Sequence, residues 1–343
     1  SVFYFRPDWL AVLMGSIIPR VPEYAPWIIE KFPEVAARPP WVETVTYIGA
    51  IGGGTYDYIG YIGLLKEKNW GMLGHPNLDE IQQKIYEITD KKGRIPLSEE
   101  KEDVSTGLAW LKAPAIDSIA AFVVILIFAA GFIIGGARLL HTEQLIPSGL
   151  KLLEYQANFL TRIHPLLLYL YDVGIFLAIA GSIYGDFEVY TRTTYECLRG
   201  VFPRLRRVRI DKVRPWVLLY VCLGGIILMW MTRVFPNISL IDLPTFAAII
   251  GGVMTCGLWC LAMIWTDRKF LPKPYQMKTA MVVLNMIAGV AMLGLGLKAW
   301  WDFGVEKINS GLLAFMILAL MVITSMVIMA IINRYYQKKG IIA

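Results

Sequence analysis

The residues best suited to bind a cation lie in one short stretch, GGGTYDY, from Gly52 to Tyr58. Asp57 supplies a carboxylate, and Thr55, Tyr56 and Tyr58 supply hydroxyl groups. Three consecutive glycines weaken helical structure, at a cost of about 1 kcal/mol each relative to alanine. Unwound backbone at this point would add main-chain carbonyls as further oxygen ligands. The stretch therefore has the chemistry of a cation site.

A plainer interpretation of the same residues stays open. Glycines let membrane helices pack closely, and Asp57 would then face water near the membrane surface. The run of three glycines followed by Thr-Tyr-Asp favours a site, because loose backbone in a bilayer survives only where it is buried in protein or lines a watery cavity.

The element that carries this stretch is predicted to be an interrupted membrane-spanning helix over residues 42–65. The 343-residue chain is 56% hydrophobic and 17% charged, with a mean hydropathy of +0.54, which is typical of a protein that lies mostly in lipid. A span needs about 20 apolar residues to cross roughly 30 Å of hydrocarbon. Further runs of this kind occur at 116–140, 166–184, 216–231, 243–265, 277–300 and 312–332. We therefore predict an all-α, polytopic membrane protein with about seven spans.

The basic residues predict the orientation of these spans. RLRRVR, residues 204–209, and the basic residues near both Arg268 and Arg334 fall on alternate connections, and the positive-inside rule places these connections and the C-terminus in the cytoplasm. A basic run can instead bind nucleic acid or anionic lipid, but beside a span it is usually a topology determinant. We expect a bacterial-type inner (plasma) membrane and no nucleic-acid partner.

Four regions follow from this orientation: residues 1–41 outside, the broken span 42–65, a cytoplasmic loop 66–114, and six further helices over 115–343. In the loop, Asn77 and Glu80 form a capping-box pattern before the apolar stripe of an amphipathic helix. KKGRIPLSEEKEDVSTG, residues 91–107, is charged and turn-rich and predicts a solvated linker. No catalytic or phosphate-binding motif occurs in the loop, so the sequence predicts no enzyme.

Three other polar residues are weaker candidates for a substrate path. Asp186 and Glu188 lie toward the cytoplasmic end of the span that starts near residue 166, where they either line an exit for a cation or are solvated and pair with Arg192. Thr255 is a single polar residue on an apolar face, where interhelical hydrogen bonding is the commoner role. Thr55 and Tyr56 complete the candidate path.

The order of spans and three segments resemble the Nramp family of divalent-metal transporters. The segments are FRPDWLAVLMGSIIPRVP, IGAIGGGTYDYIGYIGLLKEKNWG and DRKFLPKP, which look like the family's region after helix 5, its helix 6 and its loop after helix 10. The resemblance implies a LeuT-type inverted-repeat fold, of which this chain would be the second repeat plus two extra helices. Helices 1–5, with the family's Asp-Pro-Gly-Asn motif, would be the missing N-terminal partner of a truncated chain.

The chain departs from the family at the metal site. Members typically carry Ala-x-x-Met-Pro-His on helix 6; here Ala50 is retained, the methionine falls on Gly53 or Gly54, and the Pro-His pair falls within Gly54, Thr55 and Tyr56. Loss of the soft thioether favours harder cations such as Mg²⁺ or Mn²⁺, which is similar to the Nramp-related magnesium transporters. The metal ligands implied are Ala50, Gly53, Gly54 and Asp57.

The sequence thus predicts secondary transport of Mg²⁺ or Mn²⁺, with Fe²⁺ as a further candidate, through a site at an unwound helix and without a cofactor. The family's histidine is missing, so we expect facilitated transport in place of proton symport. One alternative is a LeuT-fold transporter of an organic solute, with Na⁺ as coupling ion. Another, ranked last, is a membrane enzyme or structural subunit in which Asp186 and Glu188 relay protons.

Overall fold

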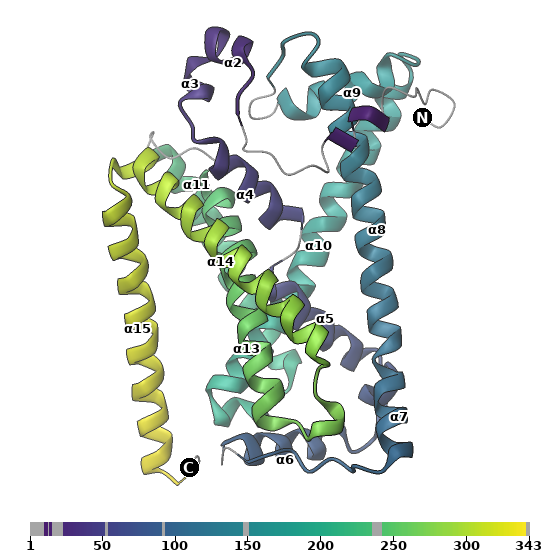
Figure 1. Cartoon of the computed structure of the whole chain (residues 1–343), viewed down its shortest axis with the longest axis vertical. Helices are drawn as coiled ribbons and strands as arrows, with labels where there is room; N and C mark the ends of the chain where they lie inside the picture. The colour runs from purple at the N-terminus through teal and green to yellow at the C-terminus, as the bar shows by residue number, and fades with distance from the viewer. Residues whose placement is uncertain are drawn as a thin grey trace. The chain divides into compact units, whose positions relative to one another are not determined.

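The computed structural model describes residues 10–12, 14–15, 23–51, 54–90, 93–146, 151–234 and 242–340. These residues form helices and contain no strand. Six helices are long and apolar enough to cross a membrane, namely Lys101–Arg138, Leu167–Val201, Ile210–Met231, Pro244–Phe270, Thr279–Ile308 and Gly311–Lys338. The prediction of an all-helical, polytopic membrane protein is confirmed (Figure 1).

The chain divides into two compact units, and the first consists of Ser1–Pro40 and Ala113–Tyr184. Its helices are α2 (Pro26–Lys31), α3 (Pro33–Ala36), nearly all of α8 (Lys112–Gly135), the π-helix η3 (Gly136–Leu140), α9 (Lys151–Thr161) and the first part of α10 (Leu167–Val201). Trp27 Nε1 donates a hydrogen bond of 3.1 Å to His141 Nδ1. This contact joins α2 to the residue that ends η3.

The second unit consists of Trp41–Lys112 and Gly185–Ala343. In chain order its elements are α4 (Pro40–Ile51), α5 (Thr55–Glu67), η2 (Gly71–Gly74), α6 (Leu78–Asp90), α7 (Lys101–Trp110), the end of α10, η4 (Pro203–Arg207), α11 (Ile210–Val234), α12 (Asp242–Ala247), the π-helix η5 (Ala248–Met254), α13 (Thr255–Phe270), η6 (Lys273–Tyr275), α14 (Thr279–Ile308) and α15 (Gly311–Lys338). It contains both halves of the interrupted helix.

The loop after the interrupted helix is more helical than the sequence predicts. α6 begins where expected, because the Asn77 carbonyl accepts the first hydrogen bond of this helix from the Ile81 N–H at 3.0 Å. Residues 93–100 have no regular structure, but α7 begins at Lys101, so the solvated linker predicted to reach residue 107 is shorter. Glu102 and Asp103 lie in the first turn of α7, where acidic side chains stabilise a helix through its dipole.

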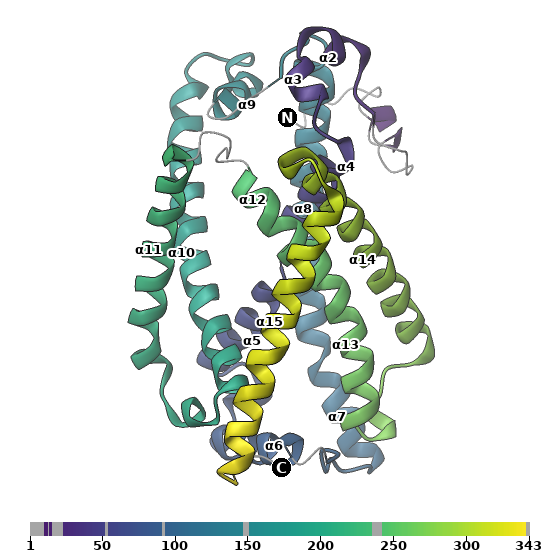
Figure 2. The same ribbon diagram turned by 90° about the vertical axis from the view of Figure 1, so that its left-hand side faces the viewer.

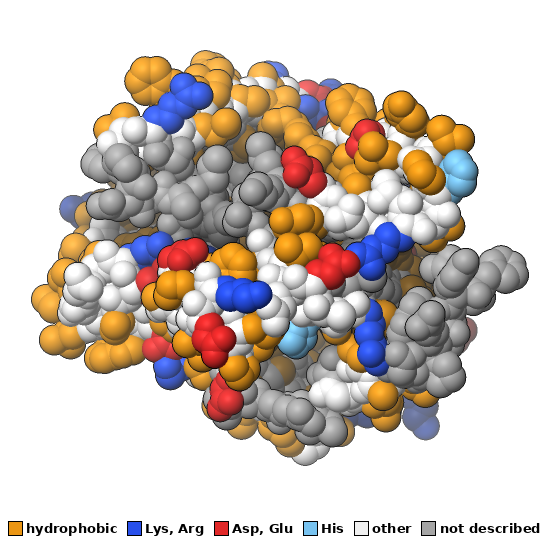
Figure 3. All heavy atoms as spheres, turned by 90° about the horizontal axis from the view of Figure 1, so that it is seen from above, with side chains coloured by type: hydrophobic (Ala, Val, Ile, Leu, Met, Phe, Trp, Pro, Cys, Tyr) orange, Lys and Arg blue, Asp and Glu red, His pale blue; other side chains and the backbone are white. Residues whose placement is uncertain are grey.

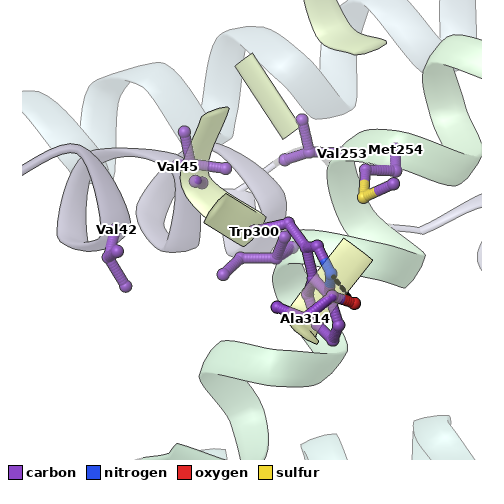
Figure 4. Close-up of a cluster of buried hydrophobic side chains, with 8 residues drawn as sticks. Val42, Val45, Val253, Met254, Trp300 and Ala314 are labelled. Atoms are coloured by element: carbon purple, nitrogen blue, oxygen red, sulfur yellow. Dashed lines mark hydrogen bonds between the residues drawn. The ribbon is translucent and has the colours of Figure 1, made fainter. Parts of the chain in front are cut away.

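The hydrophobic core of unit 2 holds the first half of the interrupted helix in place. Val42 and Val45 of α4 are at most 1% exposed and pack with Val253 of η5 and Trp300 of α14 (Figure 4). Trp300 Nε1 donates to the Ala314 carbonyl at 2.9 Å, which satisfies the indole N–H and ties α15 to α14. Figure 2 shows α13, α14 and α15 in the same part of this unit, and α14 packs against both of the others.

The outer surface of the long helices is apolar, as a lipid solvent requires. On α15, Leu320 is 64% and Met326 is 67% exposed, and water would not favour such a surface. Figure 3 shows hydrophobic side chains exposed beside acidic and basic ones on the face that it draws.

Candidate functional site

The interrupted helix ends and restarts at the glycine run. α4 ends at Ile51 and α5 begins at Thr55, so Figure 1 draws them as two separate helices. Gly54 has an extended backbone, with φ −78° and ψ 169°. Gly52 and the candidate ligand Gly53 lie outside the described residues. The last carbonyls of α4, including that of the candidate ligand Ala50, belong to a helix C-terminus, which carries partial negative charge.

Asp57 stands at the start of the second half-helix. Its Oδ2 accepts a hydrogen bond of 2.8 Å from the Gly54 N–H, and its own N–H donates to the Gly54 carbonyl at 3.0 Å. A carboxylate in the first turn satisfies an N–H that the helix leaves unpaired and is favoured by the helix dipole. One accepted hydrogen bond uses a small part of the capacity of an ionised carboxylate. Asp57 therefore fixes the break and keeps oxygen lone pairs for a further ligand.

Close glycine contacts place both half-helices against their neighbours. A Cβ added to Gly49 of α4 would lie 2.5 Å from the Ala248 carbonyl oxygen, at the start of η5. A Cβ on Gly60 of α5 would lie 2.8 Å from the Val189 carbonyl oxygen on α10. Gly54 differs, because its nearest such neighbour is the Gly251 carbonyl oxygen at 3.4 Å, an ordinary contact. The flanking glycines serve helix packing, whereas Gly54 lies at the break itself.

The second acid at the break comes from α10. Asp186 lies within electrostatic range of Asp57, and Tyr190, one turn further along α10, is within range of both acids. Tyr58 of α5 is in range of Asp57 and of Cys256 on α13. Within the described part of the chain, neither acid forms an ion pair with a lysine, arginine or histidine. Two carboxylates held near each other repel, and an added cation relieves this repulsion.

Two threonines stabilise the backbone around the break. Thr193 of α10 is fully buried, and its hydroxyl donates to the Tyr56 carbonyl. Thr255 donates to the Ile250 carbonyl at 2.7 Å, five residues earlier, within the π-helical turn η5. The hydroxyl of Thr255 thus satisfies a carbonyl of its own helix, and π-helical turns occur frequently at functional sites.

The remaining candidates of the substrate path do not all meet. Glu188 pairs with Arg192 at 2.6 Å and with Arg214 at 3.3 Å. The predicted pairing with Arg192 is thus confirmed, but Arg192 is buried, at 5% exposed, and not solvated. The side chain of Tyr56 is 51% exposed, and the side chain of Thr55 is outside the described atoms. Asp186 is therefore the predicted path residue that lies within electrostatic range of Asp57, and Glu188 belongs to a separate ion-pair network.

Sequence reasoning missed Thr193 and Tyr190. Both lie in VYTRTTYE, residues 189–196, which follows an apolar run and reads as the polar exit of a span. The available signal was a cluster of threonines in a helix that continues past the expected membrane boundary, because threonines in such positions are often buried and hydrogen-bonded.

The ligand set at the break consists of oxygen atoms. Among the described residues, no group of three or more His, Cys, Asp or Glu side chains is placed to hold a metal ion. A carboxylate beside a helix break offers oxygen ligands, and Mg²⁺ typically takes one or two carboxylates and keeps several of its own water molecules. The arrangement suits a weakly held hard cation better than a tightly bound structural metal.

A scan against models of protein families, a search of curated proteins and a search of solved structures each found no match.

Proposed function

We propose that this protein moves divalent metal cations, Mg²⁺ or Mn²⁺, across the membrane through a site at the break between α4 and α5. The observation that carries this proposal is the carboxylate of Asp57, which accepts a hydrogen bond of 2.8 Å from the extended Gly54 and has no basic partner on the described chain. Asp186 lies within electrostatic range of it. Unpaired acids are rare in membrane-spanning proteins and usually functional.

The geometry favours a cation over other ligands. The C-terminus of α4, at Ile51, lies at the break and carries the negative end of the helix dipole, and Asp57 follows six residues later in the sequence. Both the helix dipole and the acids attract positive charge there. An amino acid or another organic solute would in addition need a group that recognises its carboxylate or its apolar part.

The resemblance to the Nramp family supports the same proposal at a finer level. In that family the broken helix 6 carries half of the metal site, and the oxygen-rich sequence at Gly54 and Asp57 fits the branch that lacks the methionine. We infer facilitated transport by a LeuT-type fold in a plasma membrane, with the C-terminus in the cytoplasm. The three histidines, His75, His141 and His164, lie in or beside connections and not at the break, which fits transport without proton coupling.

The test is uptake of Mg²⁺ and Mn²⁺ into proteoliposomes that contain the full-length protein. Asp57→Asn keeps an oxygen that can accept the hydrogen bond from Gly54 but removes the charge, so we expect it to fold and to lose most uptake. Asp172→Asn is the matched control, because Asp172 lies on α10 at an exposed position far along the helix from Asp186. Uptake at the wild-type rate by Asp57→Asn removes this residue from the site and overturns the proposal.

Calorimetry separates a metal substrate from an organic solute. We expect binding heat with MgCl₂ or MnCl₂ and none with amino acids in the presence of Na⁺. The reverse pattern would assign the break to an organic solute and would contradict the proposal.

A further inference from the structure

A second feature of unit 2 is a cavity of about 390 Å³ at the C-terminal end of α5, the end away from the glycine break. Its walls come from the last turns of α5, the segment up to α6, the last turns of α10 and the first residue of α11. Pockets for small molecules range from about 300 to 1,000 Å³, so the cavity is large enough for a small ligand.

The cavity is lined by more basic than acidic side chains. Lys66, Arg192 and Arg199 supply three positive charges, and Glu67 and Glu196 supply two negative charges. Each acid is shared between bases. Glu196 Oε1 lies 2.9 Å from Lys66 Nζ and 3.6 Å from Arg199 Nη1, and one carboxylate cannot neutralise two cations.

The acid on the other side of the cavity, Glu67, belongs to a balanced group in which Glu67 and Glu188 both pair with Arg192 and Arg214. Glu67 pairs with Arg192 and, at 3.5 Å, with Arg214, which also reaches Glu188 at 3.3 Å. No acid that lines the cavity is therefore left to neutralise Arg199 fully.

Arg199 is the least satisfied of these bases. It is 6% exposed, its Nη2 donates to the Arg206 carbonyl at a long 3.3 Å, and its guanidinium stacks on the Tyr195 ring at 5.1 Å. Its Nε has no hydrogen-bond partner within the described part of the chain. An arginine has five N–H donors, and a buried donor without an acceptor costs free energy. Arg199 is also one of the residues that line the cavity.

We propose that this cavity binds the phosphate group of a phosphorylated ligand, with Arg199 and Lys66 as the main contacts. A guanidinium presents a planar fork that matches two phosphate oxygens, and a lysine adds a point charge. The phosphate belongs either to a lipid headgroup or to a small soluble molecule, since basic pockets between membrane helices bind both kinds of anion. This inference does not depend on metal transport.

The test measures phosphate binding by the purified full-length protein in nanodiscs. In the soluble arm, inorganic phosphate is titrated by calorimetry into protein in phosphatidylcholine nanodiscs. In the lipid arm, native mass spectrometry counts phosphatidic acid retained by protein from mixed nanodiscs. Binding in the first arm identifies a soluble ligand, binding in the second identifies a lipid headgroup, and either result supports the proposal.

Two variants with opposite expected effects on phosphate affinity, and one control variant, make the test specific. Arg199→Ala should weaken binding at least about 10-fold, the usual effect of losing a hydrogen bond to a charged group. Glu196→Gln should strengthen binding several-fold, because it removes the acid that competes for Lys66 and Arg199. Arg209→Ala removes an arginine side chain that is 81% exposed and should leave binding within about twofold of wild type.

A purely structural ion-pair network would behave differently. It would bind neither probe, or Glu196→Gln would lower affinity together with stability, and either result overturns the proposal. If Arg199→Ala fails to fold, size-exclusion chromatography will show it. In that case the affinity of Glu196→Gln for the phosphate probe is the deciding measurement: a higher affinity than wild type supports the proposal, and a lower affinity overturns it.

Discussion

Helix α5 presents an acid to α10 at each of its ends, but the two acids meet different partners. At the N-terminal end, Asp57 lies in range of a second acid, Asp186, and neither has a basic partner on the described chain. At the C-terminal end, Glu67 pairs with the buried Arg192, and Lys66 pairs with Glu196 at 2.9 Å. An acid that the chain neutralises itself fastens two helices together, whereas two acids that it leaves unpaired favour a cation from outside.

The largest expected effect lies at the paired end. Arg192→Ala removes the closer of the two bases that Glu67 and Glu188 share and leaves them only Arg214, and Arg192 is 5% exposed. We expect a loss of about 2–3 kcal/mol in stability, between the values for exposed and buried ion pairs, measured as a lower melting temperature in detergent. Arg209→Ala, which removes the exposed pair with Asp211, should change stability by less than about 0.5 kcal/mol. If Arg192→Ala and Arg209→Ala lowered the melting temperature equally, the ion pairs at the C-terminal end of α5 would not hold it against α10.

A single added methyl group, in Gly60→Ala, tests the contact between α5 and α10 at a point between Asp57 and Glu67. In Gly60→Ala the new Cβ would lie 2.8 Å from the Val189 carbonyl oxygen and 2.9 Å from Thr193 Oγ1. Backbone cannot yield as a flexible side chain does, so we expect a loss of about 1–3 kcal/mol and weaker cation binding. Gly174→Ala on α10 meets no atom within 4 Å and should be neutral or slightly stabilising. Thermal unfolding of both proteins gives the comparison, and an unchanged Gly60→Ala would show that α5 and α10 need not touch.

Neutralising an acid should have opposite effects on stability at the two ends. Asp186→Asn should lower cation affinity at least about 10-fold, or about 1.4 kcal/mol. Without a divalent cation it should maintain or raise the melting temperature, because repulsion from Asp57 is relieved. Glu67→Gln should lower the melting temperature, because it removes a partner of Arg192. Destabilisation by both variants would remove the difference between the ends.

The smallest expected effect concerns the π-helical turn next to the break. Thr255→Val removes the hydrogen bond of 2.7 Å to the Ile250 carbonyl and keeps the side-chain shape. We expect a loss of about 1 kcal/mol in stability and a cation affinity within about twofold of wild type, measured by thermal unfolding and calorimetry. A large loss of affinity would instead place the Thr255 hydroxyl among the ligands.

Much of the architecture followed from the sequence alone. Long apolar runs, the glycine interruption before Thr55 and the polar start of α6 at Asn77 are local features, and local features decide where helices begin, end and enter lipid. The helices extend further than the apolar runs, as at Lys101 and at Val201, because a helix can continue into water where hydropathy no longer reports it.

The partners of each polar side chain were decided by tertiary structure. Asp186 and Glu188 are two residues apart and looked equivalent in the sequence, yet a helix turns about 200° over that distance. One therefore lies near Asp57 and the other pairs with Arg192. The sequence determined that a glycine run interrupts the helix and that an acid follows it. Only the packing of α5 on α10 decided which acids stay unpaired, because this depends on residues more than 120 positions apart in the chain.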